Sequence, residues 1–136
     1  MKINKKLVFA SALAACAAAP AVAEITELPA SFYDDFAVSG YVNTASKECA
    51  GASVNQKNFN KLMNDTLVEV SAAGLDPVEA VNFLTTDVGT EQMQMRETAF
   101  RARHGVAETG YDGLCQAIKA EADENKDFRK LVKFKN

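Results

Sequence analysis

The fold of this chain depends on the segment VSGYVNTASKEC, residues 38–49. Its apolar side chains recur at intervals of three, four and seven residues, which places them on one face of an α-helix that Ser31 can cap. This face is formed by Val38, Tyr41, Val42, Ala45 and Cys49. Because Cys49 shares the apolar face, we expect its sulfur to point into the core.

A second predicted helix carries Cys115 on its own apolar face. That face is formed by Tyr111, Leu114, Cys115, Ile118 and Ala122. Cys49 and Cys115 are the only cysteines after residue 23, so an oxidising compartment would join them in one structural disulfide. A redox-active pair is disfavoured, because catalytic dithiols usually occur in C-x-x-C motifs.

The first 23 residues have the organisation of a secretory signal peptide. Lysines precede an uncharged run from Leu7 to Ala19, which is too short to span a bilayer. An A-x-A cleavage site, Ala21-Val22-Ala23, then stands before Glu24. We therefore expect a periplasmic or secreted protein whose mature chain, residues 24–136, forms one helical domain.

An alternative processing site lies at Cys16. The residues Leu13-Ala14-Ala15-Cys16 resemble a bacterial lipobox, in which the cysteine becomes the lipidated first residue of an envelope lipoprotein. The A-x-A site after Pro20 favours cleavage between Ala23 and Glu24. A membrane contact is expected only if Cys16 is lipidated.

Start and stop signals indicate further helices between the two cysteines. A helix over about 55–73 begins at the N-cap Asn55 and stops at Gly74. A shorter helix, from 77 to 84 or 85, begins with Asp76-Pro77 as cap and first residue. These signals are local, and no convincing alternation typical of a β-strand accompanies them.

The next helix, from residue 87 or 90 to 103, has two apolar faces. One contains Met93 and Phe100, and a nearly opposite one contains Val88, Met95, Ala99 and Ala102. Two such faces predict a helix that packs between neighbours. Together with an amphipathic end at Phe128, these elements predict an all-α fold: a small bundle of five or six short helices joined by one disulfide.

The composition excludes several classes of function. Hydrophobic residues make up 48% and charged residues 24% of the 136 residues, as in ordinary globular domains. The net charge of −3 and the lack of tryptophan give no indication of nucleic-acid binding. One histidine and three cysteines offer little for a transition-metal site, and phosphate-loop and nucleophile motifs are missing. We therefore predict no catalytic residues, no metal and no cofactor.

Charge is divided unevenly along the chain. Residues 24–125 carry seven basic and 17 acidic side chains, whereas residues 126–136 carry five basic and one acidic. The five basic residues are the candidate partner-binding residues Lys126, Arg129, Lys130, Lys133 and Lys135. We favour a terminal helix packed through Phe128, Leu131 and Val132. A docking arm for an acidic protein or an anionic membrane, and a segment lying on the acidic body, are the alternatives.

The order of these features resembles a family of small exported alphaproteobacterial proteins that is catalogued as a domain of unknown function. The resemblance extends over nearly all of the mature chain, and the spaced cysteines are its most specific part. It implies a compact exported helical domain and brings no activity or ligand. The segments that carry it are Lys47-Glu48-Cys49, Gly74-Leu75-Asp76-Pro77, Met95-Arg96-Glu97-Thr98-Ala99-Phe100, His104-Gly105-Val106, Leu114-Cys115 and Arg129-Lys130-Leu131.

From these observations we predict a non-enzymatic exported protein that acts through contacts with an unknown protein partner. Chaperone-like activity is one form of this prediction. Salt bridges, rather than an anion site, are expected for Arg96, Arg101 and Arg103, and His104 is expected to interact with a helix end. The alternative is a small-ligand-binding domain whose pocket is lined by Phe59, Met63, Met93, Phe100 and Tyr111.

Overall fold

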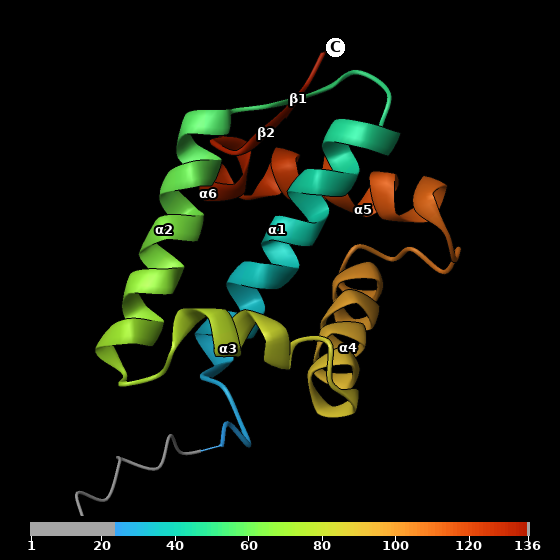
Figure 1. The fold of residues 1–136 in the computed structure, drawn as a ribbon. Helices are drawn as coiled ribbons and strands as arrows, with labels where there is room; N and C mark the ends of the chain where they lie inside the picture. The colour runs from blue at the N-terminus through green and yellow to red at the C-terminus, as the bar shows by residue number, and fades with distance from the viewer. Residues whose placement is uncertain (1–23, 136) are drawn as a thin grey trace, which may run out of the picture.

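The computed structural model describes residues 24–135. The predicted signal peptide and Cys16 lie outside this range. The described elements are α1 (Ala30–Glu48), β1 (Ala52–Val54), α2 (Gln56–Ala72), α3 (Pro77–Phe83), α4 (Asp87–Arg103), α5 (Tyr111–Glu124), α6 (Lys126–Arg129) and β2 (Val132–Phe134). The predicted helical fold class is confirmed (Figure 1).

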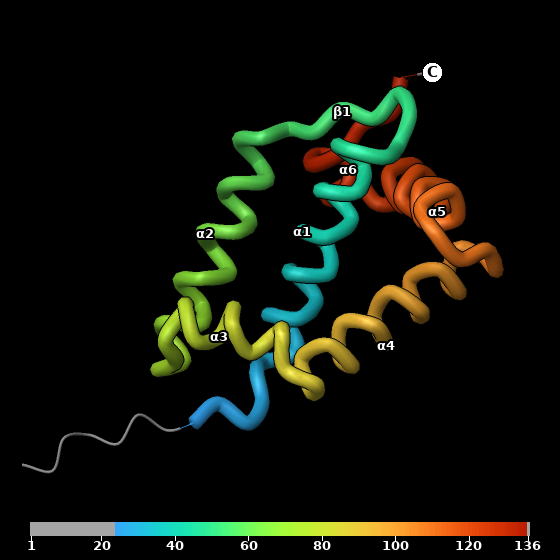
Figure 2. Tube along the Cα trace, turned by 45° about the vertical axis from the view of Figure 1, so that its right-hand side comes forward, coloured from blue at the N-terminus to red at the C-terminus, as the bar shows by residue number. Residues whose placement is uncertain are grey.

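Helix α1 is the central element of the bundle. Helices α2 and α4 lie on either side of it, α3 crosses near its beginning, and α5 crosses near its end (Figures 1 and 2). The predicted inner face is confirmed, since Tyr41, Val42, Ala45 and Cys49 are buried and Val38 is half-buried. Burial of this face supplies the hydrophobic stabilisation around which the other helices are arranged.

Two of the predicted helix caps are present. Asn55 accepts a hydrogen bond from the backbone N–H of Asn58, and Asp76 accepts from the N–H groups of Val78 and Glu79. Helix α1 differs, because it begins at Ala30 after Pro29 and has no side-chain cap. Proline serves there because its fixed φ suits a helix start.

The turn from α3 into α4 requires glycine at position 89. A Cβ atom on Gly89 would lie 2.2 Å from the carbonyl oxygen of Phe83 and 2.6 Å from the Cα of Leu84. The N–H of Gly89 also donates to the Thr86 hydroxyl, which caps α4. Because of this close approach, α3 and α4 follow one another with almost no loop.

The end of the chain forms a strand, contrary to the predicted terminal helix. Helix α6 spans four residues, and β2 then pairs antiparallel with β1 in the register Ala52↔Phe134, Ser53↔Lys133 and Val54↔Val132. Two flanking backbone hydrogen bonds extend the pairing, from Asn55 N–H to the Leu131 carbonyl and from Lys135 N–H to the Gly51 carbonyl. The backbone N–H and C=O groups of this segment therefore form hydrogen bonds with β1 and not within further helical turns.

The two predicted cysteines are joined as expected. The Cys49–Cys115 disulfide has an S–S distance of 2.02 Å and a Cα–Cα distance of 5.5 Å, and it connects the end of α1 to the first turns of α5. The inner face of α5 is as predicted except at Tyr111, which is 60% exposed. Tyr111 is the first residue of α5 and lines an open hollow on the surface.

Candidate functional site

The basic C-terminal segment is anchored in the core by its apolar side chains. Phe128 is 5% exposed and Val132 is fully buried, while Leu131 is half-buried. Phe128 and Val132 belong to the same cluster as Val42 and Ile118 of α1 and α5. The prediction that these apolar side chains pack on the body is therefore confirmed, although the segment is one short helix, α6, followed by the strand β2.

The five basic side chains of this segment have different environments. Arg129 donates to the backbone carbonyls of Ala122 and Asp123 and so satisfies the C-terminal end of α5. Lys130 forms an ion pair with Asp127 at 2.7 Å. Within residues 24–135, no ion pair is formed by the exposed Lys126, Lys133 and Lys135. These three lysines remain the part of the predicted partner site that faces solvent.

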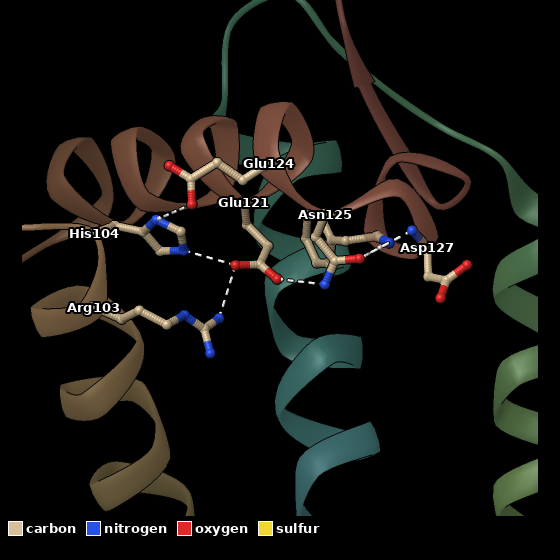
Figure 3. A network of polar contacts seen from close by, with 7 residues as sticks. Arg103, His104, Glu121, Glu124, Asn125 and Asp127 are labelled. Atoms are coloured by element: carbon tan, nitrogen blue, oxygen red, sulfur yellow. Dashed lines mark hydrogen bonds and ion pairs between the residues drawn. The ribbon is translucent and has the colours of Figure 1, made fainter.

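A buried polar network lies where the end of α4 meets α5 (Figure 3). Glu121 is 8% exposed, and its carboxylate accepts hydrogen bonds from Arg103 at 2.8 Å, from His104 Nε2 at 2.7 Å and from Asn125 Nδ2 at 2.7 Å. The His104 side chain is 2% exposed and packs edge-on against Phe100. One carboxylate thus receives three donors at the junction of α4 and α5.

The charge of Glu121 follows from these contacts. Burial by itself raises the pKa of this carboxyl group, but hydrogen bonds from Asn125 and His104 and the positive charge of Arg103 outweigh burial, so the pKa is lowered below its ordinary value. The carboxylate is therefore ionised at neutral pH and can only accept. His104 Nε2 must then carry the hydrogen that it donates.

The network continues into the C-terminal segment. Asn125 donates to Glu121 through its amide nitrogen and accepts from the N–H groups of Asp127 and Phe128 through its oxygen, which caps α6. The arrangement therefore joins α4, α5 and α6. Sequence analysis did not identify Glu121, although an acid between Ile118 and Ala122 on the inner face of α5 was a visible signal.

The three arginines of α4 are held by separate acidic partners. Arg96 pairs with Asp34 at 2.7 Å, Arg101 with Glu97 at 2.7 Å, and Arg103 with Glu121 at 2.8 Å. Salt bridges were predicted for all three, and the pair of Arg101 with Glu97 lies within α4 as expected, whereas Asp34 and Glu121 belong to α1 and α5. Arg101 also donates to the backbone carbonyls of Glu108 and Gly110 in the α4–α5 loop. The three guanidinium groups therefore do not converge on one anion site, although Arg96 and Arg103 border the same groove.

One apolar face of α4 has no neighbour among residues 24–135. Met93 and Phe100 point inward as predicted, but Val88 is 49% and Met95 is 56% exposed, and Ala99 and Ala102 are exposed as well. The prediction that both faces are packed is wrong. The reason is tertiary, because α1 and α5 contact α4 from the Phe100 side, and no described element covers the side of Met95.

A groove of about 270 Å³ runs between α1 and α4. We call it the Gly40 groove; it is lined by Ala37, Gly40, Tyr41, Thr44, Leu84, Thr90, Met93, Gln94, Glu97 and Leu114. The ring of Tyr41 stacks on Phe100 with a centroid distance of 4.0 Å and also borders a second, more polar groove towards Arg96 and Arg103.

The five residues predicted to line a ligand pocket do not converge on one site. Met93 lines the Gly40 groove, Phe100 lines the second groove, and Tyr111 lies in an open surface hollow beside Glu108. Phe59 packs against the main core, and Met63 is half-buried on α2. Only Met93 of the predicted set therefore contributes to the Gly40 groove.

The chain was compared with family models, curated proteins and solved structures, and nothing matched in any of the three. The resemblance to the exported alphaproteobacterial family accordingly stays a prediction. Within residues 24–135, no group of three or more His, Cys, Asp or Glu side chains is placed to hold a metal ion. In the same part of the chain, no helix combines the length and the apolar character needed to cross a membrane.

Proposed function

We propose that this protein is a non-enzymatic exported domain that acts by contact with another polypeptide through the outer face of α4. The observation that carries the proposal is the exposed apolar stripe formed by Val88, Met95, Ala99 and Ala102. Met95, Ala99 and Ala102 lie on successive turns of the helix, and apolar side chains gathered on an outer face are typical of a protein interaction site.

The stripe has the spacing of a helix that receives an apolar partner segment. Val88 and Met95 are seven residues apart, and Ala99 and Ala102 continue the same face for two further turns. The alanines leave the helix backbone close to the surface, so a partner segment can approach closely, while Val88 and Met95 provide larger contacts. Chaperone-like binding of exposed apolar segments is the form of contact that we propose.

Export is part of the proposal. Its support is the signal-peptide organisation of residues 1–23 together with the Cys49–Cys115 disulfide, which suits an oxidising compartment. Lipidation at Cys16 is the alternative means of reaching the envelope.

The contact hypothesis is tested by light scattering from a client protein that aggregates when it is diluted from guanidinium chloride without any reductant, at neutral and at acidic pH. We expect suppression by the wild-type protein, loss of suppression by Met95→Glu, and full suppression by the control Val68→Glu, which places the same charge on the exposed face of α2. The proposal is overturned if stoichiometric protein fails to suppress aggregation, or if Met95→Glu acts like the wild type.

A further inference from the structure

Helix α1 contains a glycine that packing does not explain. Gly89 is required because a Cβ atom would lie 2.2 Å from the Phe83 carbonyl oxygen, and at Gly113 a Cβ atom would lie 2.5 Å from the Glu108 carbonyl oxygen. At Gly40 a Cβ atom would meet nothing within 4 Å. Glycine in the interior of a helix is less favourable than alanine, so Gly40 lowers the stability of α1 without relieving a close approach.

The missing side chain at Gly40 opens the groove between α1 and α4. Ala37, Gly40, Tyr41 and Thr44 occupy one face of α1 at helical spacing, and all four line this groove. A larger side chain at position 40 would extend into the space beside Tyr41. Gly40 therefore leaves this part of the groove open to a ligand.

The walls of the Gly40 groove are amphipathic. The apolar wall is formed by α1, the end of α3, α4 and α5, through the side chains of Ala37, Leu84, Met93 and Leu114 respectively. The polar rim is formed by Thr44, Thr90, Gln94 and Glu97. Its volume of about 270 Å³ lies just below the roughly 300–1,000 Å³ of pockets for drug-sized molecules. The groove suits a small compound with one polar end.

Among residues 24–135, Glu97 is the only charged residue that lines this groove. Arg101 binds its Oε1 atom through both Nε and Nη2, at 3.0 and 2.7 Å, so Oε2 is not used in that ion pair. The hydroxyl of Tyr41 takes part in no hydrogen bond within residues 24–135, and its oxygen keeps some solvent contact although the residue as a whole is 7% exposed. Burial, with the nearby Glu97 carboxylate, raises the pKa of Tyr41 to about 12, so this hydroxyl stays protonated.

We propose that the Gly40 groove binds a small primary amine with an aromatic or branched aliphatic body. The ammonium group pairs with Oε2 of Glu97 beside the Tyr41 hydroxyl, and the body lies along Ala37, Met93 and Leu114. A carboxylate ligand is disfavoured because the single charge of the lining is negative and no cation of the lining would neutralise it. This site is independent of the outer face of α4 used in the proposed function.

Three probes that share one aromatic body test this assignment: 2-phenylethylamine, 2-phenylethanol and phenylacetate. Each is titrated into ¹⁵N-labelled, disulfide-bonded protein, and amide chemical shifts are followed. We expect saturable shifts at Gly40, Thr44 and Glu97 with the amine, affinity weaker by at least about tenfold with the alcohol, and no saturation with the carboxylate. Equal binding of phenylacetate, or no saturable shift with the amine, overturns the proposal.

Variants at Gly40 and Glu97 separate the groove from adventitious binding. Gly40→Leu fills the groove and should weaken amine binding at least about tenfold, whereas the matched control Ser46→Leu places the same side chain on the exposed face of α1 and should leave amine binding nearly unchanged. Glu97→Gln should reduce amine affinity to that of the alcohol. Circular dichroism and melting temperature confirm folding of each variant. Unchanged amine affinity in Gly40→Leu refutes the site. Met95→Glu, which changes the outer face of α4, should leave amine affinity unchanged, so failure of this proposal can be told apart from failure of the proposed function.

Discussion

His104 Nε2 donates to Oε2 of Glu121 at 2.7 Å, and the two side chains, 2% and 10% exposed, join the end of α4 to α5. The pair is the centre of a network rather than an isolated contact, because Arg103 and Asn125 bind the same carboxylate. Its position, away from the Gly40 groove, indicates a structural role. The charge of Glu121 should therefore be visible in the pH dependence of stability.

The first prediction concerns acid. Since the pKa of Glu121 is lower in the folded state than its ordinary value of 4.5, the carboxylate adds stability above that pH and this contribution is lost as the pH falls through the lowered value. Replacement by Gln should cost about 1–3 kcal/mol at pH 7, because His104 and Arg103 lose a charged acceptor.

Thermal melting of the wild type and Glu121→Gln between pH 7 and pH 3 measures this difference. The gap in melting temperature should narrow below pH 4.5. The matched control is Glu124→Gln, because Glu124 is exposed and lies 3.8 Å from His104 Nδ1. A gap that stays constant down to pH 3 would show that the charge of Glu121 is not involved.

The second prediction concerns the disulfide. Replacing both Cys49 and Cys115 by serine should lower the free energy of unfolding by about 2–5 kcal/mol, because the bridge closes a long loop in the unfolded chain. Urea denaturation of the wild type and the variant measures the change. Alkylation of protein isolated under non-reducing conditions should find no free thiol in the mature chain, and two free thiols would contradict the bridge.

The third prediction concerns the C-terminal segment. Deletion from Lys126 onward removes buried Phe128 and Val132, each of which contributes about 1.5–3 kcal/mol, and also leaves β1 without a partner strand. The melting temperature should fall strongly. A truncated protein with the same melting temperature as the full mature chain would instead favour the alternative in which the segment is a docking arm.

The exposed lysines of this segment provide the control for truncation. Charge reversal at Lys126, Lys133 and Lys135 should leave the melting temperature nearly unchanged, since these side chains are exposed and form no ion pair in residues 24–135. If an acidic partner docks here, the triple variant should lose that binding. The wild-type affinity should also weaken between low and physiological salt.

The fourth prediction contrasts two glycines that the sequence does not distinguish. Gly89→Ala should destabilise the protein by about 1–3 kcal/mol, because the methyl group would lie 2.2 Å from a backbone oxygen. Gly40→Ala should stabilise it by about 0.4–1 kcal/mol, because it restricts the unfolded chain and meets no neighbour. Chemical denaturation of the pair checks both signs, and destabilisation by Gly40→Ala would contradict the open groove.

The fifth prediction concerns processing. Intact mass spectrometry of protein from a bacterial host should give the mass of residues 24–136 less two hydrogens for the disulfide. Cys16→Ala should leave that mass unchanged. The mass of residues 16–136 with diacylglycerol on Cys16, lost in Cys16→Ala, would establish the lipoprotein alternative.

The sequence by itself predicted those features that depend on neighbours three or four residues away. The N-cap residues Asn55 and Asp76 were predicted correctly, and so was the buried face of α1. The same spacing predicted that Cys49 points into the core, where it is bonded to Cys115. Helical geometry places such residues on one side whatever surrounds the helix, so local spacing contains the necessary information.

Only the tertiary structure decided which of the two apolar faces of α4 is packed, because both have helical spacing and α1 contacts just the Phe100 side. It also decided that residues 132–134 form a strand. Three residues are too few for a recognisable alternation, and their hydrogen-bond partners, residues 52–54, lie far away in the sequence. The Glu121–His104 pair and the opening beside Gly40 likewise depend on how separate helices meet, and no local pattern specifies that meeting.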